Sequence, residues 1–153
     1  MARRKRKRAK RDEAALPRPN EKRKGSRVVV ADDDGEMRAL LRGWLEGEGL
    51  DVDEVSDGVA LVEYLVRCWM EDSKMAGLRL VVTDQRMPGF CGTRIIEAVR
   101  LVGEDLPVLL VTAFPEPALV EHALELGVTG VIAKPVDQED FLARVRAVIG
   151  ERE

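Results

Sequence analysis

From residue 27 onwards, the chain alternates short apolar runs with longer segments whose apolar residues recur every three or four positions. The short runs have the length and the β-branched content of buried β-strands. Such strands are expected at residues 28–31, 51–55, 78–83, 108–111 and 128–133. The longer segments have the period of amphipathic α-helices. The pattern therefore predicts five units, each a strand followed by a helix.

Each predicted helix has an apolar face that follows from residue spacing, and Gly47 and Gly49 mark the end of the first helix. In chain order, the apolar positions are Met37, Leu40, Leu41, Trp44 and Leu45; Val62, Leu65, Val66 and Trp69; Ile95, Val99 and Val102; Leu119, Ala123 and Leu126; and Phe141, Leu142, Val145, Val148 and Ile149. Both tryptophans of the chain fall on these faces. We therefore expect Trp44 and Trp69 in the core.

The first and fourth strands are wholly apolar, which is typical of strands covered on both faces in a parallel sheet. Only about 126 residues follow residue 27, too few for a closed barrel of eight strand–helix units. The expected fold is therefore α/β, with an open, doubly wound, five-stranded parallel sheet.

The net charge of −3 averages two opposite parts of the chain. Residues 1–27 hold 13 Lys and Arg against three acidic residues, a local charge of +10, and the remainder carries −13. The basic block from Arg3 to Arg11 repels itself and has little to bury, while Pro17 and Pro19 favour an extended chain. We predict a disordered polybasic arm over residues 1–26 and a folded domain over residues 27–150.

Several classes of protein do not fit this composition. No apolar run reaches the roughly 20 residues of a membrane-spanning helix, and the basic N-terminus does not lead into the apolar core of a secretion signal. The two cysteines, Cys68 and Cys91, are too few for a disulfide framework or a cysteine-rich metal cluster. We expect a cytoplasmic protein with no membrane span.

Charged and hydroxyl side chains follow four of the predicted strands. The first strand ends in Asp32, Asp33 and Asp34, and the later ones end in Asp84, Thr112 and Lys134. A single Asp after a strand commonly caps the next helix. In an open α/β sheet, however, the carboxyl ends of the strands meet along one edge, where ligands bind.

Together these side chains indicate phosphoryl chemistry. Carboxylates that converge on one crevice repel one another unless a cation neutralises them. Mg²⁺ prefers such oxygen ligands and takes phosphate as a further ligand, and a lysine with a threonine hydroxyl can pair with phosphate oxygens. We infer a metal-assisted phosphoryl site with one Asp as the nucleophile.

Four segments resemble the receiver domain of two-component response regulators. They are Val28–Arg38, Thr83–Gly92, Val111–Ala113 and Ala133–Pro135, all in the family's order. The resemblance covers the chain from Arg27 to Ile149. It implies a flavodoxin-like sheet with strand order 2-1-3-4-5.

The resemblance also implies roles for the acidic residues. Asp84 matches the phospho-accepting aspartate. Asp32 and Asp33 match the acidic pair that holds Mg²⁺ together with Asp84, and the backbone carbonyl of Arg86 is a further expected ligand. Mg²⁺ is thus the implied cofactor.

At the other strand ends, Thr112 matches the hydroxyl that contacts the phosphoryl group, and Lys134 matches the lysine that pairs with it. The bond between Lys134 and Pro135 is expected to be cis. The chain departs from the family in carrying Val131 in place of an aromatic residue three positions before the lysine. Phe114, two residues after Thr112, is bulky at a position where the family varies.

Other departures bear on the switch and on the class of chemistry. Val136 stands where a Phe is common two residues after Lys134, so the aromatic switch of the family is not expected here. An aspartyl-nucleophile phosphatase would carry a second acid two residues after Asp84, where this chain has Arg86. The resemblance therefore implies a phosphorylated signalling protein and not an enzyme.

The expected function is a stand-alone receiver in a phosphorelay, because the chain ends at Glu153, shortly after the last helix. Its implied partners are a sensor histidine kinase or phosphotransfer protein and a downstream protein target. The alternative is a phospho-regulated protein that binds nucleic acid or acidic surfaces through the basic arm. The arm has no aromatic residues for stacking on bases, which favours a solubilising tail or one that contacts the acidic domain.

Overall fold

The computed structural model describes residues 26–71, 77–101 and 105–152. The predicted arm, apart from its last residue, and Val102 lie outside these described residues. The elements in chain order are β1 (Arg27–Ala31), α1 (Gly35–Gly47), β2 (Asp51–Val55), α2 (Gly58–Met70), β3 (Leu78–Asp84), α4 (Gly92–Leu101), β4 (Val108–Thr112), α5 (Pro117–Glu125), β5 (Gly130–Ala133) and α6 (Gln138–Arg152).

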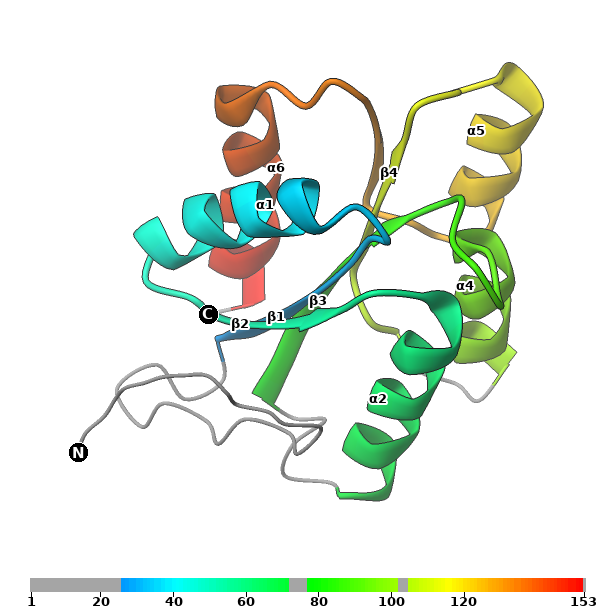
Figure 1. Cartoon of the computed structure of the whole chain (residues 1–153), viewed down its shortest axis with the longest axis horizontal. Helices are drawn as coiled ribbons and strands as arrows, with labels where there is room; N and C mark the ends of the chain where they lie inside the picture. Colours follow the sequence, from blue (N-terminus) through cyan, green and yellow to red (C-terminus); the bar gives the residue numbers. More distant parts are fainter. Residues whose placement is uncertain (1–25, 72–76, 102–104, 153) are drawn as a thin grey trace.

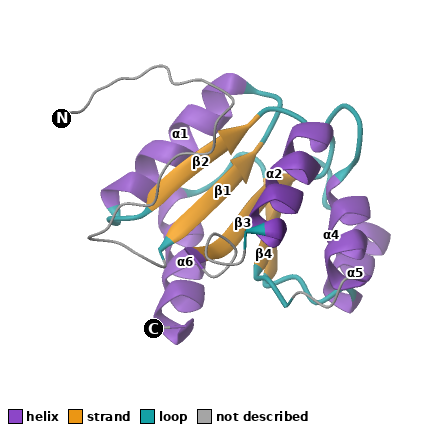
Figure 2. Cartoon of the chain, turned by 90° about the horizontal axis from the view of Figure 1, so that it is seen from below, coloured by secondary structure: helices purple, strands orange, loops and turns teal. Residues whose placement is uncertain are grey.

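The five strands form one parallel sheet in the order β2-β1-β3-β4-β5. Helices α1 and α6 cover one face, and α2, α4 and α5 cover the other (Figures 1 and 2). This arrangement confirms the predicted doubly wound α/β fold and its strand order. Among the described residues, no helix combines the length and apolar character needed to span a membrane.

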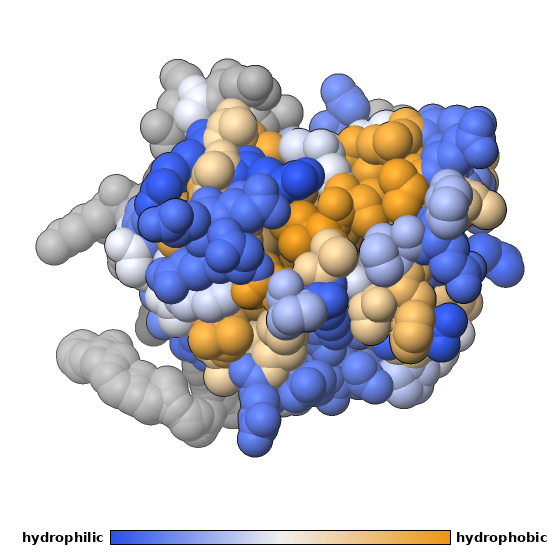
Figure 3. All heavy atoms as spheres, turned by 90° about the horizontal axis from the view of Figure 1, so that it is seen from above, coloured by the Kyte–Doolittle hydropathy of each residue, from blue (hydrophilic) through white to orange (hydrophobic). Residues whose placement is uncertain are grey.

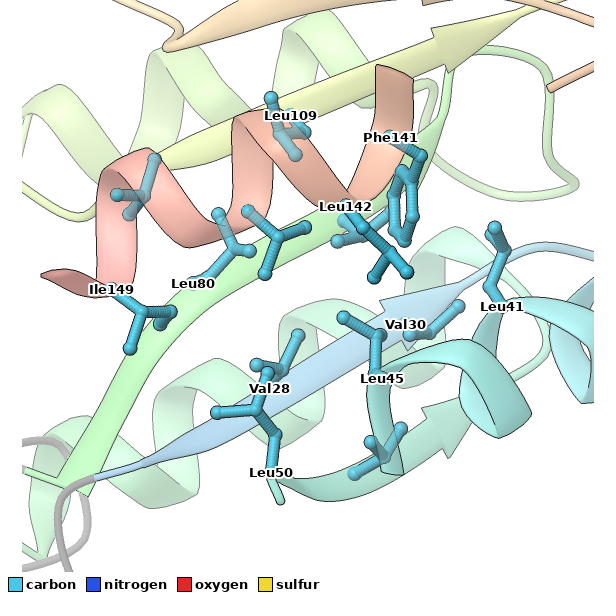
Figure 4. Close-up of a cluster of buried hydrophobic side chains, with 14 of the residues drawn as sticks. Val28, Val30, Leu41, Leu45, Leu50, Leu80, Leu109, Phe141, Leu142 and Ile149 are labelled. Carbon is cyan, nitrogen blue, oxygen red and sulfur yellow. The ribbon is translucent and has the colours of Figure 1, made fainter. Parts of the chain in front are cut away.

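Two hydrophobic cores lie on opposite faces of the sheet because successive side chains of a strand point to opposite sides. Val28 and Val30 of β1 belong to the core under α1 and α6, where Leu45 and Phe141 are fully buried (Figure 4). Val29 belongs to the core under α2, α4 and α5. The wholly apolar sequence of β1 is thus explained by burial on both faces.

Four strand boundaries differ from the prediction. β1 begins at Arg27 and not at Val28, and β4 extends to Thr112, one residue further than expected. β3 extends to Asp84, one residue further than expected. β5 begins at Gly130 and not at Val128, because the N–H of Val128 donates to the carbonyl of Ala123 and so completes the turn after α5. Apolar residues alone do not distinguish such a turn from the first residues of a strand.

The prediction that Trp69 belongs to the core is wrong. Its side chain is 48% exposed, and Val66, assigned to the same buried face, is 44% exposed. The residues of α2 that face the sheet are Leu61, Tyr64, Leu65 and Cys68. Because α2 is apolar on both sides, spacing alone did not identify its buried face.

The buried residues of α1 agree better with the predicted apolar face than those of α2 do. Leu41 and Leu45 are buried, and Trp44 is half-buried with its ring 5.9 Å from the ring of Phe141. Leu40, which was assigned to the same face, is 45% exposed. The apolar face of α1 is therefore narrower than the spacing predicted.

Candidate functional site

Three carboxylates meet at the carboxyl ends of β1 and β3. One oxygen from each of Asp32, Asp33 and Asp84 lies within 4.8 Å of the others. Asp32 and Asp84 are buried, whereas Asp33 is exposed. The fold thus brings together residues that are 52 positions apart in sequence, as the order of strand ends predicted.

The turn between β1 and α1 fixes the orientation of Asp32. Its Oδ1 accepts the backbone N–H of Asp34 at 2.9 Å, and its backbone carbonyl accepts Nη1 of Arg38 at 2.7 Å. Asp34 itself caps α1 by accepting the backbone N–H groups of Glu36 and Met37. The third Asp of the run therefore has a structural role.

Lys134 connects the two buried carboxylates. Its Nζ donates to Oδ2 of Asp32 at 3.1 Å and to Oδ2 of Asp84 at 3.2 Å. The bond from Lys134 to Pro135 is cis, as the resemblance implied. The backbone N–H of Lys134 also donates to the carbonyl of Thr112 at 2.8 Å. This hydrogen bond joins the residue after β5 to the end of β4.

Thr112 is buried at the end of β4, and its Oγ1 accepts the backbone N–H of Phe114 at 3.1 Å. This hydrogen bond orders the first residues of the loop between β4 and α5. Arg86 follows β3, where its backbone N–H faces Oδ1 of Asp84 at 3.4 Å. Its carbonyl remains a predicted metal ligand.

The close approach of Asp32, Asp84 and Lys134 affects the pKa values of Asp84 and Lys134. Burial, together with the negative charge of Asp32, raises the pKa of Asp84, although Lys134 acts in the opposite direction. Burial alone would lower the pKa of Lys134, but its hydrogen bonds and ion pairs with Asp32 and Asp84 outweigh burial and raise it. The site therefore holds a permanent cation beside two carboxylates.

An open groove of about 590 Å³ lies beside the carboxylates. It is lined by Asp33, Gln85, Arg86, Met87, Pro88, Cys91, Thr112, Phe114, Glu116 and Leu119. At its rim, the guanidinium carbon of Arg86 lies 4.6 Å from the ring centroid of Phe114. The strand-end pattern did not predict this contact, because it joins two loops from different strands.

The surface around this edge of the sheet is mixed in character. Figure 3 shows a band of hydrophobic side chains bordered on both sides by hydrophilic ones. Phe114 is an exposed apolar side chain of the groove, at 54%. The groove therefore presents an exposed aromatic side chain next to charged residues of the site.

The donor atoms fit a hard divalent cation. Three carboxylates with oxygens within 4.8 Å of one another match the oxygen ligands and the low number of protein contributors that Mg²⁺ favours. Asp32, Asp33 and Asp84 would hold the ion, while Lys134 compensates only part of their charge.

The loop after β3 is held by contacts that sequence reasoning missed. The side-chain carbonyl of Gln85 accepts the backbone N–H of Thr93 at 2.9 Å, and its amide donates to the Thr93 hydroxyl at 3.1 Å. Gly92 leaves no space for a side chain, since an added Cβ would lie 2.8 Å from Leu110. Only the glycine gave a signal in the sequence, through its place in the Thr83–Gly92 segment.

Comparison with protein families gives one match over most of the chain. Residues 28–146 match the response regulator receiver domain. Two curated relatives are the response regulator RppA of Synechocystis, 30% identical over 122 residues, and the response regulator MprA of Mycobacterium leprae, 32% identical over 123 residues. Each alignment covers 80% of this chain and 50% of the relative, so the chain spans about half the length of these proteins.

Solved structures share the fold. The Francisella response regulator 1452 receiver domain has a TM-score of 0.73 at 21% identity, covering 84% of this chain and 99% of that one. A CheX–CheY–BeF₃–Mg²⁺ complex from Borrelia burgdorferi has a TM-score of 0.72 at 23% identity, with 81% and 89% coverage. The chemotaxis protein CheY4 of Vibrio cholerae has a TM-score of 0.65 at 24% identity, with 80% and 98% coverage.

Proposed function

Since this chain belongs to the response regulator receiver family, we propose that Asp84 accepts a phosphoryl group from a sensor histidine kinase or a phosphotransfer protein. The observation that carries the proposal is the convergence of Asp32, Asp33 and Asp84, with Lys134 bonded to two of them. We assign the acceptor role to Asp84 and not to Asp32, although Lys134 contacts both, because Asp84 ends the central strand β3 and matches the phospho-accepting aspartate of the family.

The transfer forms one bond and breaks another. A carboxylate oxygen of Asp84 attacks phosphorus, an acyl phosphate forms, and the phosphorus–nitrogen bond to the donor histidine breaks. The leaving imidazole takes up a proton and departs neutral. Lys134, already 3.2 Å from Asp84, pairs with the negative charge on the transferred group.

Asp32, Asp33, Asp84 and the carbonyl of Arg86 are the proposed ligands of Mg²⁺. The bound ion would neutralise the carboxylates and bind an oxygen of the phosphoryl group. The hydrogen bonds from Asp34 and Arg38 keep Asp32 oriented, so that the ligands do not have to reorganise during transfer.

The signal is proposed to leave the site through Thr112 and the loop that follows it. The Thr112 hydroxyl accepts a hydrogen bond from Phe114. When that hydroxyl turns to donate to a phosphoryl oxygen, the start of this loop has to adjust. In NMR spectra with beryllofluoride as a phosphoryl mimic, we expect shifts between Phe114 and Leu126. Shifts confined to the loop after Asp84 would contradict this route.

We further propose a stand-alone relay protein that acts in the cytoplasm, with a folded receiver over residues 27–150 and a separate basic arm over residues 1–26. The match to the receiver family over residues 28–146 supports the folded part. The downstream target is a protein that recognises the phosphorylated state.

Phosphotransfer from purified, radiolabelled sensor histidine kinases tests the donor. Label should move to the wild-type chain only with Mg²⁺ and should not move to the Asp84→Asn variant. Asp34→Asn is the matched control, because Asp34 caps α1, and it should still accept label. If no kinase transferred label to a chain that a small phosphodonor still labels, the donor assignment would be wrong while the acceptor assignment stood.

The charge of the arm favours a second function. Twelve Lys and Arg residues among the first 26 give this segment the composition of a polyanion-binding tail. Binding to nucleic acid should weaken steeply as salt rises, since the Debye length is only about 10 Å at 0.1 M salt. Deleting residues 1–26 should abolish this binding and leave phosphorylation of Asp84 intact. Equal nucleic-acid binding by the truncated chain would show that the arm is not the segment that binds.

A further inference from the structure

All four polar groups of Asp32 take part in hydrogen bonds. Its backbone N–H donates to the carbonyl of Val55 at 3.2 Å, and its two carboxylate oxygens accept from Asp34 and Lys134. Its backbone carbonyl accepts Nη1 of Arg38 at 2.7 Å. Arg38 therefore fixes the peptide group of Asp32 and leaves both carboxylate oxygens to other partners.

Glu54 of β2 determines where the guanidinium of Arg38 lies. Its Oε1 accepts Nε of Arg38 at 3.2 Å, and its Oε2 accepts Nη1 of Arg42 at 2.7 Å. Arg38 and Arg42 are four residues apart on α1, so they lie on one face of the helix, where like charges repel. The carboxylate between them offsets this repulsion and keeps Arg38 directed at Asp32.

The edge strand β2 presents Glu54 to α1 because successive side chains of a strand point to opposite faces. Val52, two residues earlier, packs in the core under α1 and α6. Asp53 points to the other face, where it accepts the hydroxyl of Tyr64 on α2. The side chain of Glu54 is only 25% exposed. Its ion pair with Arg38 is therefore screened less by solvent than a pair on the open surface.

We propose that Glu54 is a positioning residue of the Mg²⁺ site, which acts through Arg38 on the peptide group of Asp32. This inference rests on the proposed role of Asp32 as a ligand of Mg²⁺. Glu54 contributes in two ways. It holds the guanidinium against the Asp32 carbonyl, and it neutralises a positive charge that would otherwise repel a cation bound beside it.

Titration calorimetry of the full chain with Mg²⁺ alone tests the proposal. Glu54→Gln keeps the size of the side chain and removes its charge. It should raise the dissociation constant for Mg²⁺ about 3–10-fold, at or below the lower end of the effects of groups that orient metal ligands.

Glu48→Gln is the matched control. Glu48 is 26% exposed, nearly the same as Glu54, and it also binds an arginine, Arg146, at 2.7 Å. It follows the last residue of α1, whereas the carboxylates lie near the first residue of this helix. Glu48→Gln should therefore bind Mg²⁺ like the wild type.

A double-mutant cycle tests whether Glu54 acts through Arg38. In an Arg38→Gln background, most of the effect of Glu54→Gln on Mg²⁺ binding should disappear, because the contact that transmits it is already lost. If the two substitutions weakened binding independently, so that their effects added, the route through Arg38 would be wrong.

Phosphorylation by a small phosphodonor separates positioning of the ion from a general loss of structure. For Glu54→Gln, the Mg²⁺ concentration that gives half-maximal labelling should rise by the same factor as the dissociation constant. The rate of labelling at saturating Mg²⁺ should equal that of the wild type. A rate that is reduced at every Mg²⁺ concentration would instead indicate a structural defect and would contradict the proposal.

These measurements also distinguish the failure of this inference from the failure of the proposed function. If the wild type bound no Mg²⁺, the metal site and the role of Glu54 would both be wrong. If the wild type bound Mg²⁺ and Glu54→Gln bound it equally well, only the role of Glu54 would be wrong. The same conclusion would follow if Glu48→Gln weakened binding by the same factor as Glu54→Gln.

Discussion

At the scale of single residues, Val131 stands where the family carries the aromatic ring of its switch, and Phe114 lies in the loop after β4. Val131 is half-buried and packs against the core under α2, α4 and α5. Its branched side chain has one stiff torsion and cannot rotate between two positions as a ring can. Phe114 is exposed, lines the groove and stacks with Arg86. We expect this side chain to change its burial on phosphorylation.

We predict that Phe114→Ala shortens the lifetime of the acyl phosphate. We expect the ring and the guanidinium, 4.6 Å apart at the rim of the groove, to limit the approach of water to the acyl phosphate. If the pair contributes ~1 kcal/mol to the barrier, hydrolysis should become about fivefold faster. The lifetime can be measured as loss of phosphate by intact-mass spectrometry.

Val131→Ala is the control for this prediction. It should lower the free energy of unfolding by about 1 kcal/mol through lost packing and leave the lifetime unchanged. Equal lifetimes for the wild type and Phe114→Ala would remove the shielding role.

Residue chemistry at strand ends was predictable because parallel strands end along one edge, so Asp32, Asp84 and Lys134 had to meet there. The buried group formed by Arg27, Asp53 and Tyr64 was not predictable. It joins neighbouring strands to a helix, with the Tyr64 hydroxyl 2.5 Å from Oδ2 of Asp53. No local pattern in the sequence indicates such a contact.

At the scale of elements, periodicity predicted where the strands and helices lie in the sequence. It did not predict which side of each helix is buried. Spacing located α2 but included Trp69 in its buried face, because tertiary contacts decide which of two apolar sides is covered. Arg100 is a second case. Its guanidinium donates to the carbonyls of Leu106, Leu126 and Gly127, and so ties α4 to the end of α5. An arginine at the end of a helix gives no sign of these partners.

The contact between α2 and the loop after β3 gives a prediction about glycine. An added Cβ on Gly58 would lie 2.1 Å from the carbonyl oxygen of Phe90, and the Gly58 N–H donates to the carbonyl of Pro88. Gly58→Ala should therefore displace the loop and lower the free energy of unfolding by about 1–3 kcal/mol. Denaturant unfolding measures this change.

Gly43→Ala is the matched control in α1, where nothing lies within 4 Å of an added Cβ. It should stabilise the protein by up to about 1 kcal/mol, because alanine favours the helix. If Gly58→Ala were as well tolerated as Gly43→Ala, the close packing of α2 on the loop would not exist in solution.

At the scale of the whole molecule, stability should depend on the protonation of Asp53. Burial raises its pKa to about 6, against the lowering effects of its hydrogen bond with Tyr64 and the charge of Arg27. The folded state then binds this proton more tightly than the unfolded state does. The stabilising contribution is complete below the unfolded pKa of 3.8 and is lost as pH rises through about 6.

Between about pH 7 and pH 5, the free energy of unfolding should therefore rise by roughly 1 kcal/mol from this group. The raised pKa of Asp84 acts in the same direction. Urea unfolding of the wild type and of Asp53→Asn over this range separates the two. A slope against pH that Asp53→Asn leaves unchanged would exclude Asp53 as its source.

The fold as a whole and the chemistry at its strand ends could be predicted because both follow from patterns that repeat along the chain. The separation of charge between the N-terminal 27 residues and the remainder was equally evident from sequence. The side on which α2 is covered, the Arg86–Phe114 contact and the groove depend on distances between loops, which only the folded structure supplies.

The central claim is that Asp84 is phosphorylated in a site built from Asp32, Asp33 and Lys134. Intact-mass spectrometry after incubation with a small phosphodonor and Mg²⁺ tests it most directly. We predict one added phosphate on the wild-type chain, none in the presence of EDTA and none on Asp84→Asn. Persistent labelling of Asp84→Asn to the wild-type level would contradict the claim.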